Sequence, residues 1–341
     1  MTDREMVRLE AGSVVALRMY DLGRALDVDA LARAAGGDVE RPQFPSAAGG
    51  GLRYTRPPVE LTLDDVEVPL EGGRLFADTT VRIFDFGIAV VALRVLVGGL
   101  DWDRFAERVE EIGAAVEGEA QAWSEVEERL RRTLQPARLR LDGKAVARHV
   151  FVIARRFGAP LPVDQLVDEE YAAGIVSSDW LPLTSTARAD LLRGARAAGS
   201  DLVVTGEERT FIVEPVPGSG VPDAIEAALA QRAFYDLART LGLSPTSNGR
   251  GSREVRGRAA RARRRLGYAD VAVMPERTGR LAAMYATARD RFRVGEAESA
   301  ADRRLASLTA GGPGGRLPLL PLVVVALLAA VATALIFLVL G

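Results

Sequence analysis

Residues Thr80–Val97, TVRIFDFGIAVVALRVLV, contain two apolar segments that meet at Gly87. β-Branched and aromatic residues dominate both segments, which is typical of strands, and a glycine can supply a bend or bulge between them. The stretch therefore predicts two strands joined at Gly87. A second hairpin is predicted over Asp201–Val216, DLVVTGEERTFIVEPV, with its turn at Gly206–Arg209. Both hairpins indicate substantial antiparallel pairing in this part of the chain.

Aspartate pairs follow two predicted strands and precede a helix in each case. Asp27 and Asp29 come after the strand Val14–Tyr20, and Asp101 and Asp103 come after the second strand of the opening stretch. An aspartate just before a helix can accept hydrogen bonds from the first free N–H groups, and a second one adds charge that the helix dipole favours. A metal site is the alternative use of each pair. We favour capping because it accounts for all four residues.

The first 220 residues are expected to form one α/β layer structure. A third strand is predicted over His149–Ala154, followed by a helix with Asp164 near its start. A Gly/Pro-rich stretch at residues 36–58 is typical of a long surface loop or linker. We predict that residues 1–220 are an α/β (α+β) cytoplasmic domain with a mixed, largely antiparallel sheet.

After residue 220 the pattern becomes helical. One helix is predicted over Pro222–Leu241 and another over Glu276–Leu308, where apolar residues recur at helical spacing. Unbroken, the second helix would be about 50 Å long. Residues 309–316 begin with TAGGPGG, which cannot continue a helix and predicts a flexible Gly/Pro hinge. The predicted helical region is therefore residues 221–308.

The last 25 residues, Leu317–Gly341, contain no charged residue. The 24 residues up to Leu340 would span about 36 Å as a helix, more than the hydrocarbon core of about 30 Å, so a single C-terminal transmembrane helix is predicted. The lipid bilayer is then a partner, and the protein is expected to be tail-anchored and single-pass. Arg303, Arg304 and Arg316 precede the span, which places residues 1–316 in the cytoplasm. The dominance of arginine over lysine indicates a high-GC bacterium and its inner membrane.

Within the predicted span, Ala326, Ala330 and Ala334 fall on every fourth position. This small-xxx-small spacing lets two membrane helices pack closely, so these alanines are candidates for anchor packing. Alanine is also a common filler of apolar helices, and both interpretations stay open.

The composition excludes several kinds of site. The chain has no cysteine and a single histidine, His149, which excludes disulfides, thiolate nucleophiles, iron–sulfur clusters and Cys/His zinc sites. His149 adjoins an apolar strand, which favours a structural role. Asp85-Phe86-Gly87 copies a protein-kinase triplet, but Lys144, the only lysine, follows it rather than precedes it. We therefore predict no enzyme, no cofactor and no metal. A carboxylate-dependent enzyme using Asp85, Asp101 and Asp103 is the third functional alternative.

A basic segment lies between the two predicted helices. It carries eight arginines and one acid, Glu254, in a chain whose net charge is −2: Arg250, Arg253, Arg256, Arg258, Arg261, Arg263, Arg264 and Arg265. Its candidate partners are RNA phosphates, anionic lipid and the acidic stretch Asp101–Glu128 of the same chain. No aromatic residue lies among the arginines, which disfavours base stacking on single-stranded RNA. A solvated helical face, partly neutralised within the chain, is the alternative without a binding role.

Three segments resemble the "required for meiotic nuclear division" family, whose members have an α/β domain, a helical region and a C-terminal membrane span. They are VRIFDFGIAVV at Val81–Val91, IEAALAQRAFYDLA at Ile225–Ala238 and MYATARDRFRVGEAESAADRRLASL at Met284–Leu308. The resemblance covers about a sixth of the chain and contains no catalytic signature. The family's polar features are not recognisable at the position of the arginine segment. The resemblance implies non-enzymatic scaffolding at membranes, support of translation for organellar members, and homo-oligomerisation through the long helix.

These observations favour a tail-anchored, cytoplasm-facing membrane scaffold or adaptor. It would self-associate or bind a protein partner through its helical region. The alternative is a membrane-tethered RNA- or ribosome-associated protein that uses Arg250–Arg265.

Overall fold

The fold is described from a computed structural model. It describes residues 7–35, 39–45, 51–70, 73–117, 121–139, 141, 144–159, 163–168, 171–177, 184–192, 195–198, 201–214, 218–241, 250–276 and 279–310.

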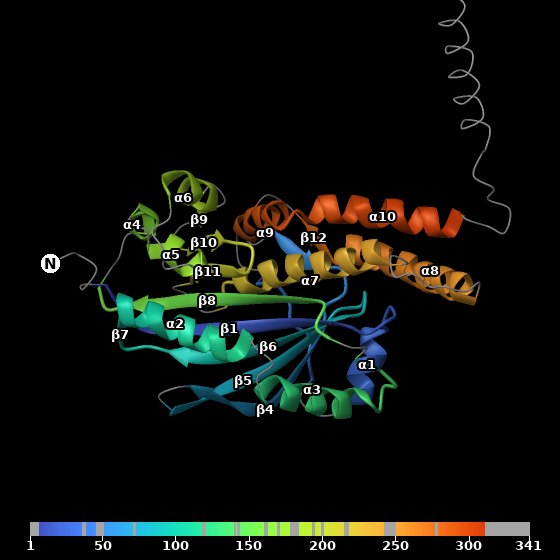
Figure 1. Cartoon of the computed structure of the whole chain (residues 1–341), viewed down its shortest axis with the longest axis horizontal. Helices are drawn as coiled ribbons and strands as arrows, with labels where there is room; N and C mark the ends of the chain where they lie inside the picture. The colour runs from blue at the N-terminus through green and yellow to red at the C-terminus, as the bar shows by residue number, and fades with distance from the viewer. Residues whose placement is uncertain are drawn as a thin grey trace, which may run out of the picture.

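A ten-stranded sheet forms the centre of the described residues, with the strand order β2-β4-β5-β6-β1-β8-β11-β10-β9 and β7 paired to β1 (Figure 1). Its strands are β1 (Arg8–Asp21), β2 (Val39–Glu40), β4 (Val59–Leu70), β5 (Gly73–Ile83), β6 (Ile88–Val97), β7 (Leu100–Asp101), β8 (Ala147–Phe157), β9 (Arg196–Ala198), β10 (Asp201–Thr205) and β11 (Arg209–Val213). Neighbouring strands pair antiparallel, except that β8 and β11 are parallel. A small antiparallel sheet joins β3 (Leu52–Tyr54) to β12 (Val273–Pro275). The fold is thus mixed α/β with a large sheet.

Both predicted hairpins are present, and Gly87 explains the shape of the first. It lies in the turn between β5 and β6 with a φ of 80°, in the left-handed region that favours glycine. A Cβ atom at this position would lie 2.0 Å from the carbonyl oxygen of Arg24. Backbone conformation and space therefore both require glycine here. The second hairpin pairs β10 with β11 and turns at residues 206–208.

Helices cover both faces of the sheet (Figure 1). Their bounds are α1 (Val28–Ala35), α2 (Trp102–Glu117), α3 (Gln121–Leu134), α4 (Val163–Asp168), α5 (Tyr171–Ser177), α6 (Ser185–Leu192), α7 (Val221–Thr240), α8 (Arg250–Asp270), α9 (Arg280–Arg291) and α10 (Val294–Ala310). Helices α1 to α5 share one apolar core with the first face, and α7 to α10 share a second core with the other face. We call α7 to α10 the helical layer.

The alternation of β1 explains the two cores. Val14 and Ala16 lie in the first core, whereas Val15, Leu17 and Met19 lie in the second. Successive side chains of a strand point to opposite faces, so a run that is apolar at every position suits a strand covered on both sides. The helical layer therefore covers the second face of the sheet. The predicted domain boundaries, including the one near residue 220, stay a prediction.

The aspartate pairs cap helices as predicted. The Oδ1 atom of Asp27 accepts hydrogen bonds from the backbone N–H groups of Asp29 and Ala30, at 3.1 and 3.0 Å. The Oδ1 atom of Asp101 likewise accepts a hydrogen bond from the backbone N–H of Arg104, at 2.9 Å. Capping is therefore the observed use of the first aspartate of each pair.

The prediction of one continuous helix over Glu276–Leu308 is wrong, because the segment breaks into α9 and α10. At the break, Arg293 has a φ of 51°, which no α-helical residue adopts. Arg232 of α7 donates hydrogen bonds to the carbonyl oxygens of Phe292 and Arg293, at 2.5 and 3.0 Å. These two hydrogen bonds replace the ones that backbone N–H groups would donate to the same carbonyls in a continuous helix.

The predicted transmembrane helix also requires correction. No helix in the described part of the chain is long and apolar enough to cross a membrane. The longest described helices, α7 and α8, carry charged side chains such as Arg232 and Arg261. The predicted span 317–341, with Ala326, Ala330 and Ala334, lies outside the described residues, as does most of the predicted hinge. The predicted single transmembrane helix, and with it the tail-anchored, single-pass membrane location, is therefore not supported. The cytoplasmic placement of residues 1–316 depended on that helix and loses its basis.

Candidate functional site

The arginine segment forms α8, which packs beside α7 and α10 in the helical layer (Figure 1). Its inward side is made of small and apolar residues at helical spacing, Ala259, Ala262, Leu266 and Ala269, all buried in the second core. The amide Nε2 of Gln231 in α7 donates a 2.7 Å hydrogen bond to the carbonyl oxygen of Ala269. These contacts fix which arginines point outward.

Arg265 points inward and is used within the fold. Only 4% of its side chain is exposed, and its guanidinium forms an ion pair with Asp21 at 2.6 Å. It also donates hydrogen bonds to the carbonyl oxygens of Phe86, at 2.7 Å, and Gly87, at 3.2 Å, and lies 4.8 Å from the ring centre of Phe234. Arg265 therefore holds α8 to the β5–β6 turn.

Four other arginines of α8 are exposed: Arg258, Arg261, Arg263 and Arg264. Arg263 donates a 3.0 Å hydrogen bond to the hydroxyl of Thr309 on α10. Arg256 is half-buried, and the side chains of Arg250 and Arg253 lie outside the described residues. Because Arg258, Arg261 and Arg264 are spaced three apart, they lie on one face of the helix. We call these three residues the arginine face.

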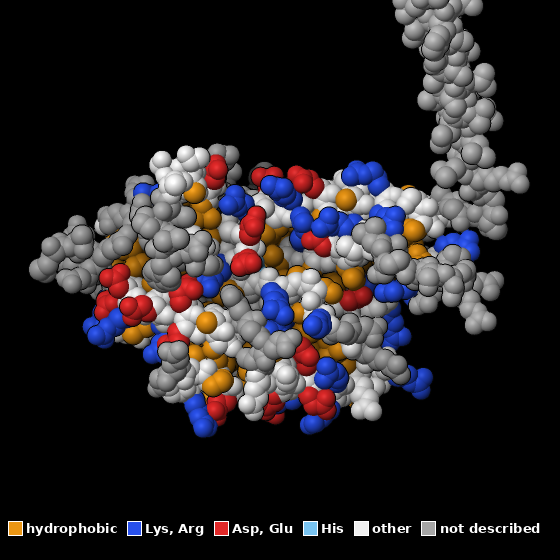
Figure 2. All heavy atoms as spheres, viewed as in Figure 1, with side chains coloured by type: hydrophobic (Ala, Val, Ile, Leu, Met, Phe, Trp, Pro, Cys, Tyr) orange, Lys and Arg blue, Asp and Glu red, His pale blue; other side chains and the backbone are white. Residues whose placement is uncertain are grey.

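The acidic stretch of the sequence does not neutralise the arginine face. Asp101–Glu128 contains all of α2 and the first part of α3, and both helices cover the opposite side of the sheet from α8 (Figure 1). Acids on α3 pair with arginines of the same helix, as Glu125 does with Arg129. Figure 2 shows acidic side chains gathered over the start of α2 and basic ones at the end of the molecule where α8 lies. The two charges are separated across the molecule.

The three carboxylates of the enzyme alternative are not brought together. Asp85 lies in the β5–β6 turn, beside the end of β1, whereas Asp101 pairs with Arg8 at the beginning of β1. The 13 steps from Arg8 to Asp21 correspond to about 43 Å at 3.3 Å per residue. Burial raises the pKa of Asp85 to about 6. No group of three potential ligands that could hold a metal ion occurs among the described residues.

His149 has the surroundings of a structural histidine. It is 2% exposed, and its Nε2 atom lies 2.9 Å from the hydroxyl of Thr210. The rings of Phe151 and Phe292 meet it edge-on, at centroid distances of 5.6 and 5.4 Å. Burial lowers the pKa of His149 to about 3, so the ring is neutral at physiological pH.

A cluster of charges around Arg82 joins β5 to the start of α7. Its guanidinium lies 2.5 Å from a carboxylate oxygen of Glu60, 2.8 Å from Asp223 and 3.2 Å from Glu226. Burial raises the pKa of Glu226 to about 7, although Arg82 opposes the change. Three carboxylates share one guanidinium, so the innermost acid holds its proton more tightly than an ordinary glutamate does.

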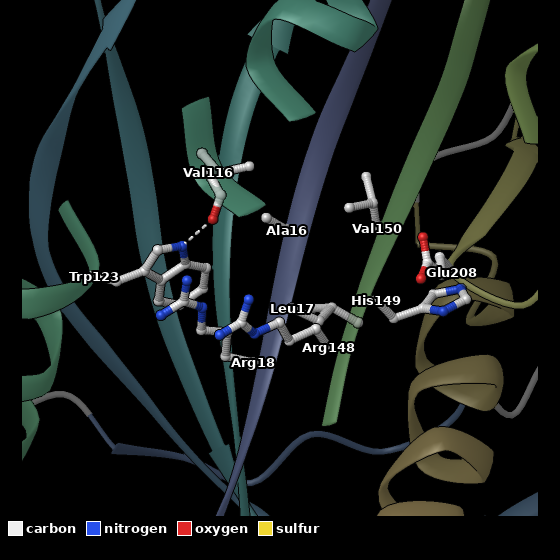
Figure 3. A pocket seen from close by; sticks show the side chains of 9 residues that line it. All are labelled: Ala16, Leu17, Arg18, Val116, Trp123, Arg148, His149, Val150 and Glu208. Carbon is white, nitrogen blue, oxygen red and sulfur yellow. Dashed lines mark hydrogen bonds between the residues drawn. The ribbon is translucent and has the colours of Figure 1, made fainter. Parts of the chain in front are cut away.

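A cavity of about 170 Å³ lies against the first face of the sheet. Strands β1 and β8 form its floor, and the end of α2 and the start of α3 lie beside it (Figure 3). It is lined by Ala16, Leu17, Arg18, Val116, Trp123, Arg148, His149, Val150 and Glu208. In Figure 3, Arg18 and Arg148 lie side by side next to Trp123, while Glu208 lies on the other side, near His149.

The two arginines of this cavity occupy directly opposite positions. Arg18 on β1 pairs in register with Arg148 on β8. Arg18 is 6% exposed, and its Cζ atom lies 4.4 Å from the ring centre of Trp123. Burial lowers the pKa of Arg18, and the neighbouring Arg148 lowers it further. Arg148 is exposed and lies at the mouth of the cavity.

Sequence reasoning did not identify this pair. One local signal for Arg18 was present, since it is the only charged residue in the apolar strand Val14–Tyr20. No signal connected it to Arg148, because the two residues meet only through the pairing of β1 with β8.

A family model described as "Uncharacterized protein MJ0711, N-terminal domain" matches residues 11–219, which is more than half of the chain. The chain belongs to this family. The matched region includes the large sheet and the cavity, whereas the helical layer follows it. No curated protein and no solved structure matches the chain. The family match gives no support to the "required for meiotic nuclear division" resemblance.

Proposed function

We propose that this protein is a non-enzymatic adaptor that binds an acidic protein partner through the arginine face of α8. One observation carries the proposal: three exposed arginines lie on one helix face, and the acidic helices of the chain lie across the sheet from them. In the described part of the chain, no carboxylate forms an ion pair with Arg258, Arg261 or Arg264. An external acidic surface would supply these pairs.

Three further points support this proposal. The carboxylates Asp85 and Asp101 lie at opposite ends of β1, which gives a carboxylate-dependent enzyme no common site. The single aromatic residue in the sequence of α8, Tyr268, lies near the end of the helix with its ring against Arg56. The arginine face therefore has no aromatic ring on which the bases of single-stranded RNA could stack. The resemblance to the "required for meiotic nuclear division" family implies a non-enzymatic scaffold.

The test compares two labelled probes of equal charge, a polyglutamate peptide and single-stranded oligouridine, by fluorescence anisotropy with the full chain. We expect the peptide to bind in a salt-sensitive manner and more tightly than the RNA. Replacing Arg258, Arg261 and Arg264 by Gln should weaken peptide binding at least tenfold, which corresponds to about 0.5 kcal/mol per charge.

A matched control removes the same charge elsewhere. Arg74, Arg94 and Arg104 are exposed and lie away from α8, so their triple replacement by Gln should leave peptide binding within about twofold of wild type. Equal losses in both variants would show that only net charge is sensed, and the proposal would fail. It would also fail if oligouridine bound more tightly than the peptide and the α8 variant abolished that binding, because the arginine face would then be an RNA site.

A further inference from the structure

Two large apolar side chains are exposed beside each other on the sheet. Of the large hydrophobic residues that the structure describes, Phe76 on β5 and Leu96 on β6 are the most exposed, at 68% and 65%. Asp78 pairs in register with Arg94, and Phe76 and Leu96 lie two positions beyond this pair on the same two strands. Large apolar side chains that are exposed together, rather than singly, are typical of an interaction surface.

Both side chains point to the second face of the sheet, at a place that the helical layer leaves open. Ala77 on β5 and Val95 on β6 lie in the first core, so the adjacent Phe76 and Leu96 point to the other face. On that face the helical layer contacts β5 at Arg82, whose guanidinium pairs with two acids at the start of α7. The six residues from Phe76 to Arg82 span about 20 Å, which leaves this end of the face free for a partner.

Phe76 lies between two opposite charges on β5. Arg74 and Asp78 point to the same face, two residues before it and two residues after it, so each lies about 7 Å away along the strand. Arg74 pairs at 3.0 Å with Glu67 of β4, but both side chains are exposed and such a pair is weak. Asp78 forms no ion pair within the described part of the chain. The order positive, apolar, negative is its own complement when the strand is turned end to end.

We propose that two copies of this chain associate through this surface, with β5 of one copy crossing β5 of the other in the opposite direction. The two-fold axis passes by Phe76, so Phe76 and Leu96 of both copies form an apolar centre, and Arg74 of each copy pairs with Asp78 of the other. Each helical layer then begins about 20 Å from the axis, whereas Gly73, the first residue of β5, lies about 10 Å from it. The helical layer of one copy therefore clears the end of β5 in the other.

The test is sedimentation velocity of the full chain over a concentration series. Because each copy contributes only two large apolar side chains, we expect a reversible dimer with a Kd of about 10–100 µM. Phe76→Ser should weaken dimerisation at least tenfold, since it removes the apolar centre from both copies, and it should fold because Phe76 is exposed. Val271→Ser is the matched control. It replaces an apolar residue that is exposed elsewhere, just after α8, and should dimerise as wild type does.

This surface belongs to the sheet and does not depend on the proposed adaptor function of α8. The triple variant of the arginine face should lose peptide binding and still dimerise as wild type does. Its control variant lacks Arg74, so it should dimerise more weakly and still bind the peptide. The two proposals can therefore fail separately.

A charge exchange tests the direction in which the two strands cross. Asp78→Arg should weaken dimerisation about tenfold, because it sets two arginines against each other at both ends of the apolar centre. Combining Asp78→Arg with Arg74→Asp restores opposite charges at both ends, so the double variant should dimerise within about threefold of wild type. A wild-type chain that is monomeric at about 300 µM, equal dimerisation of Phe76→Ser and wild type, or no recovery in the double variant would each overturn the proposal.

Discussion

The guanidinium of Arg265 donates a 2.7 Å hydrogen bond to the carbonyl oxygen of Phe86, a residue 179 positions earlier in the chain. The same side chain reaches Gly87 and Asp21. It therefore ties the helical layer to the first hairpin of the sheet at one buried point. This contact gives the arginine segment two uses, because one arginine stabilises the fold while its neighbours face solvent.

Arg265→Gln should lower the free energy of unfolding by about 2–4 kcal/mol, because the shorter side chain leaves the carbonyls of Phe86 and Gly87 and the carboxylate of Asp21 without their donor. Arg261→Gln, four positions away and exposed, should change it by less than about 0.5 kcal/mol. Urea unfolding followed by circular dichroism measures both. Similar values for the two variants would contradict the inward role of Arg265.

Gly87→Ala should destabilise the protein by about 2 kcal/mol or more, since its φ is 80° and a Cβ atom would lie 2.0 Å from the carbonyl oxygen of Arg24. Gly99→Ala is a matched control. Its φ is 72°, but no atom lies within 4 Å of the added Cβ, so we expect the conformational penalty alone, about 1 kcal/mol. Equal losses in thermal unfolding would show that the close approach to Arg24 has no energetic effect.

Glu226→Gln should change how stability depends on pH. The pKa of Glu226 is about 7 in the folded protein, against an ordinary value of 4.5, so the folded state binds more protons between these values. The contribution of Glu226 to stability is thus fully present below about pH 4.5 and is lost as the pH rises through 7. Relative to wild type, the variant should gain about 2–3 kcal/mol between pH 4 and pH 8.

Urea titrations at several pH values measure this difference. Glu67→Gln, which replaces an exposed acid on β4, is the control, and its difference from wild type should stay within about 0.5 kcal/mol at every pH. If the difference for Glu226→Gln is likewise independent of pH, burial does not raise the pKa of Glu226.

Arg293→Gly should stabilise the protein by about 0.5 kcal/mol. Arg293 has a φ of 51°, and glycine removes that penalty of about 1 kcal/mol while adding freedom to the unfolded chain. The carbonyl that accepts from Arg232 is kept. Arg303→Gly, at an exposed position inside α10, should instead destabilise by about 1 kcal/mol. Differential scanning calorimetry distinguishes the two signs, and destabilisation by Arg293→Gly would contradict a left-handed break between α9 and α10.

Features that depend on neighbouring residues could be predicted from the sequence. The strands on either side of Gly87, the turn after β10 and the caps at Asp27 and Asp101 each depend on a few consecutive side chains. The mixed sheet followed from the same local patterns. These features require no knowledge of what lies across the molecule.

Features that depend on distant contacts could not be predicted. The apolar spacing of Glu276–Leu308 continues through the break, whereas the groups that stabilise the break come from Arg232, about 60 positions earlier. The inward direction of Arg265 depends on Phe86 and Asp21. Adjacent arginines on a helix point in different directions, and only the packed partner determines which one is buried.

The position of α7 limits how this protein can be divided. The matched family region ends at residue 219 and α7 begins at Val221, yet α7 and its neighbours cover Val15, Leu17 and Met19 on the second face of the sheet. A recombinant fragment cut near residue 220 would present a broad apolar β-surface to water and should precipitate. A chain that ended with the matched region would need another apolar surface to cover that face of the sheet.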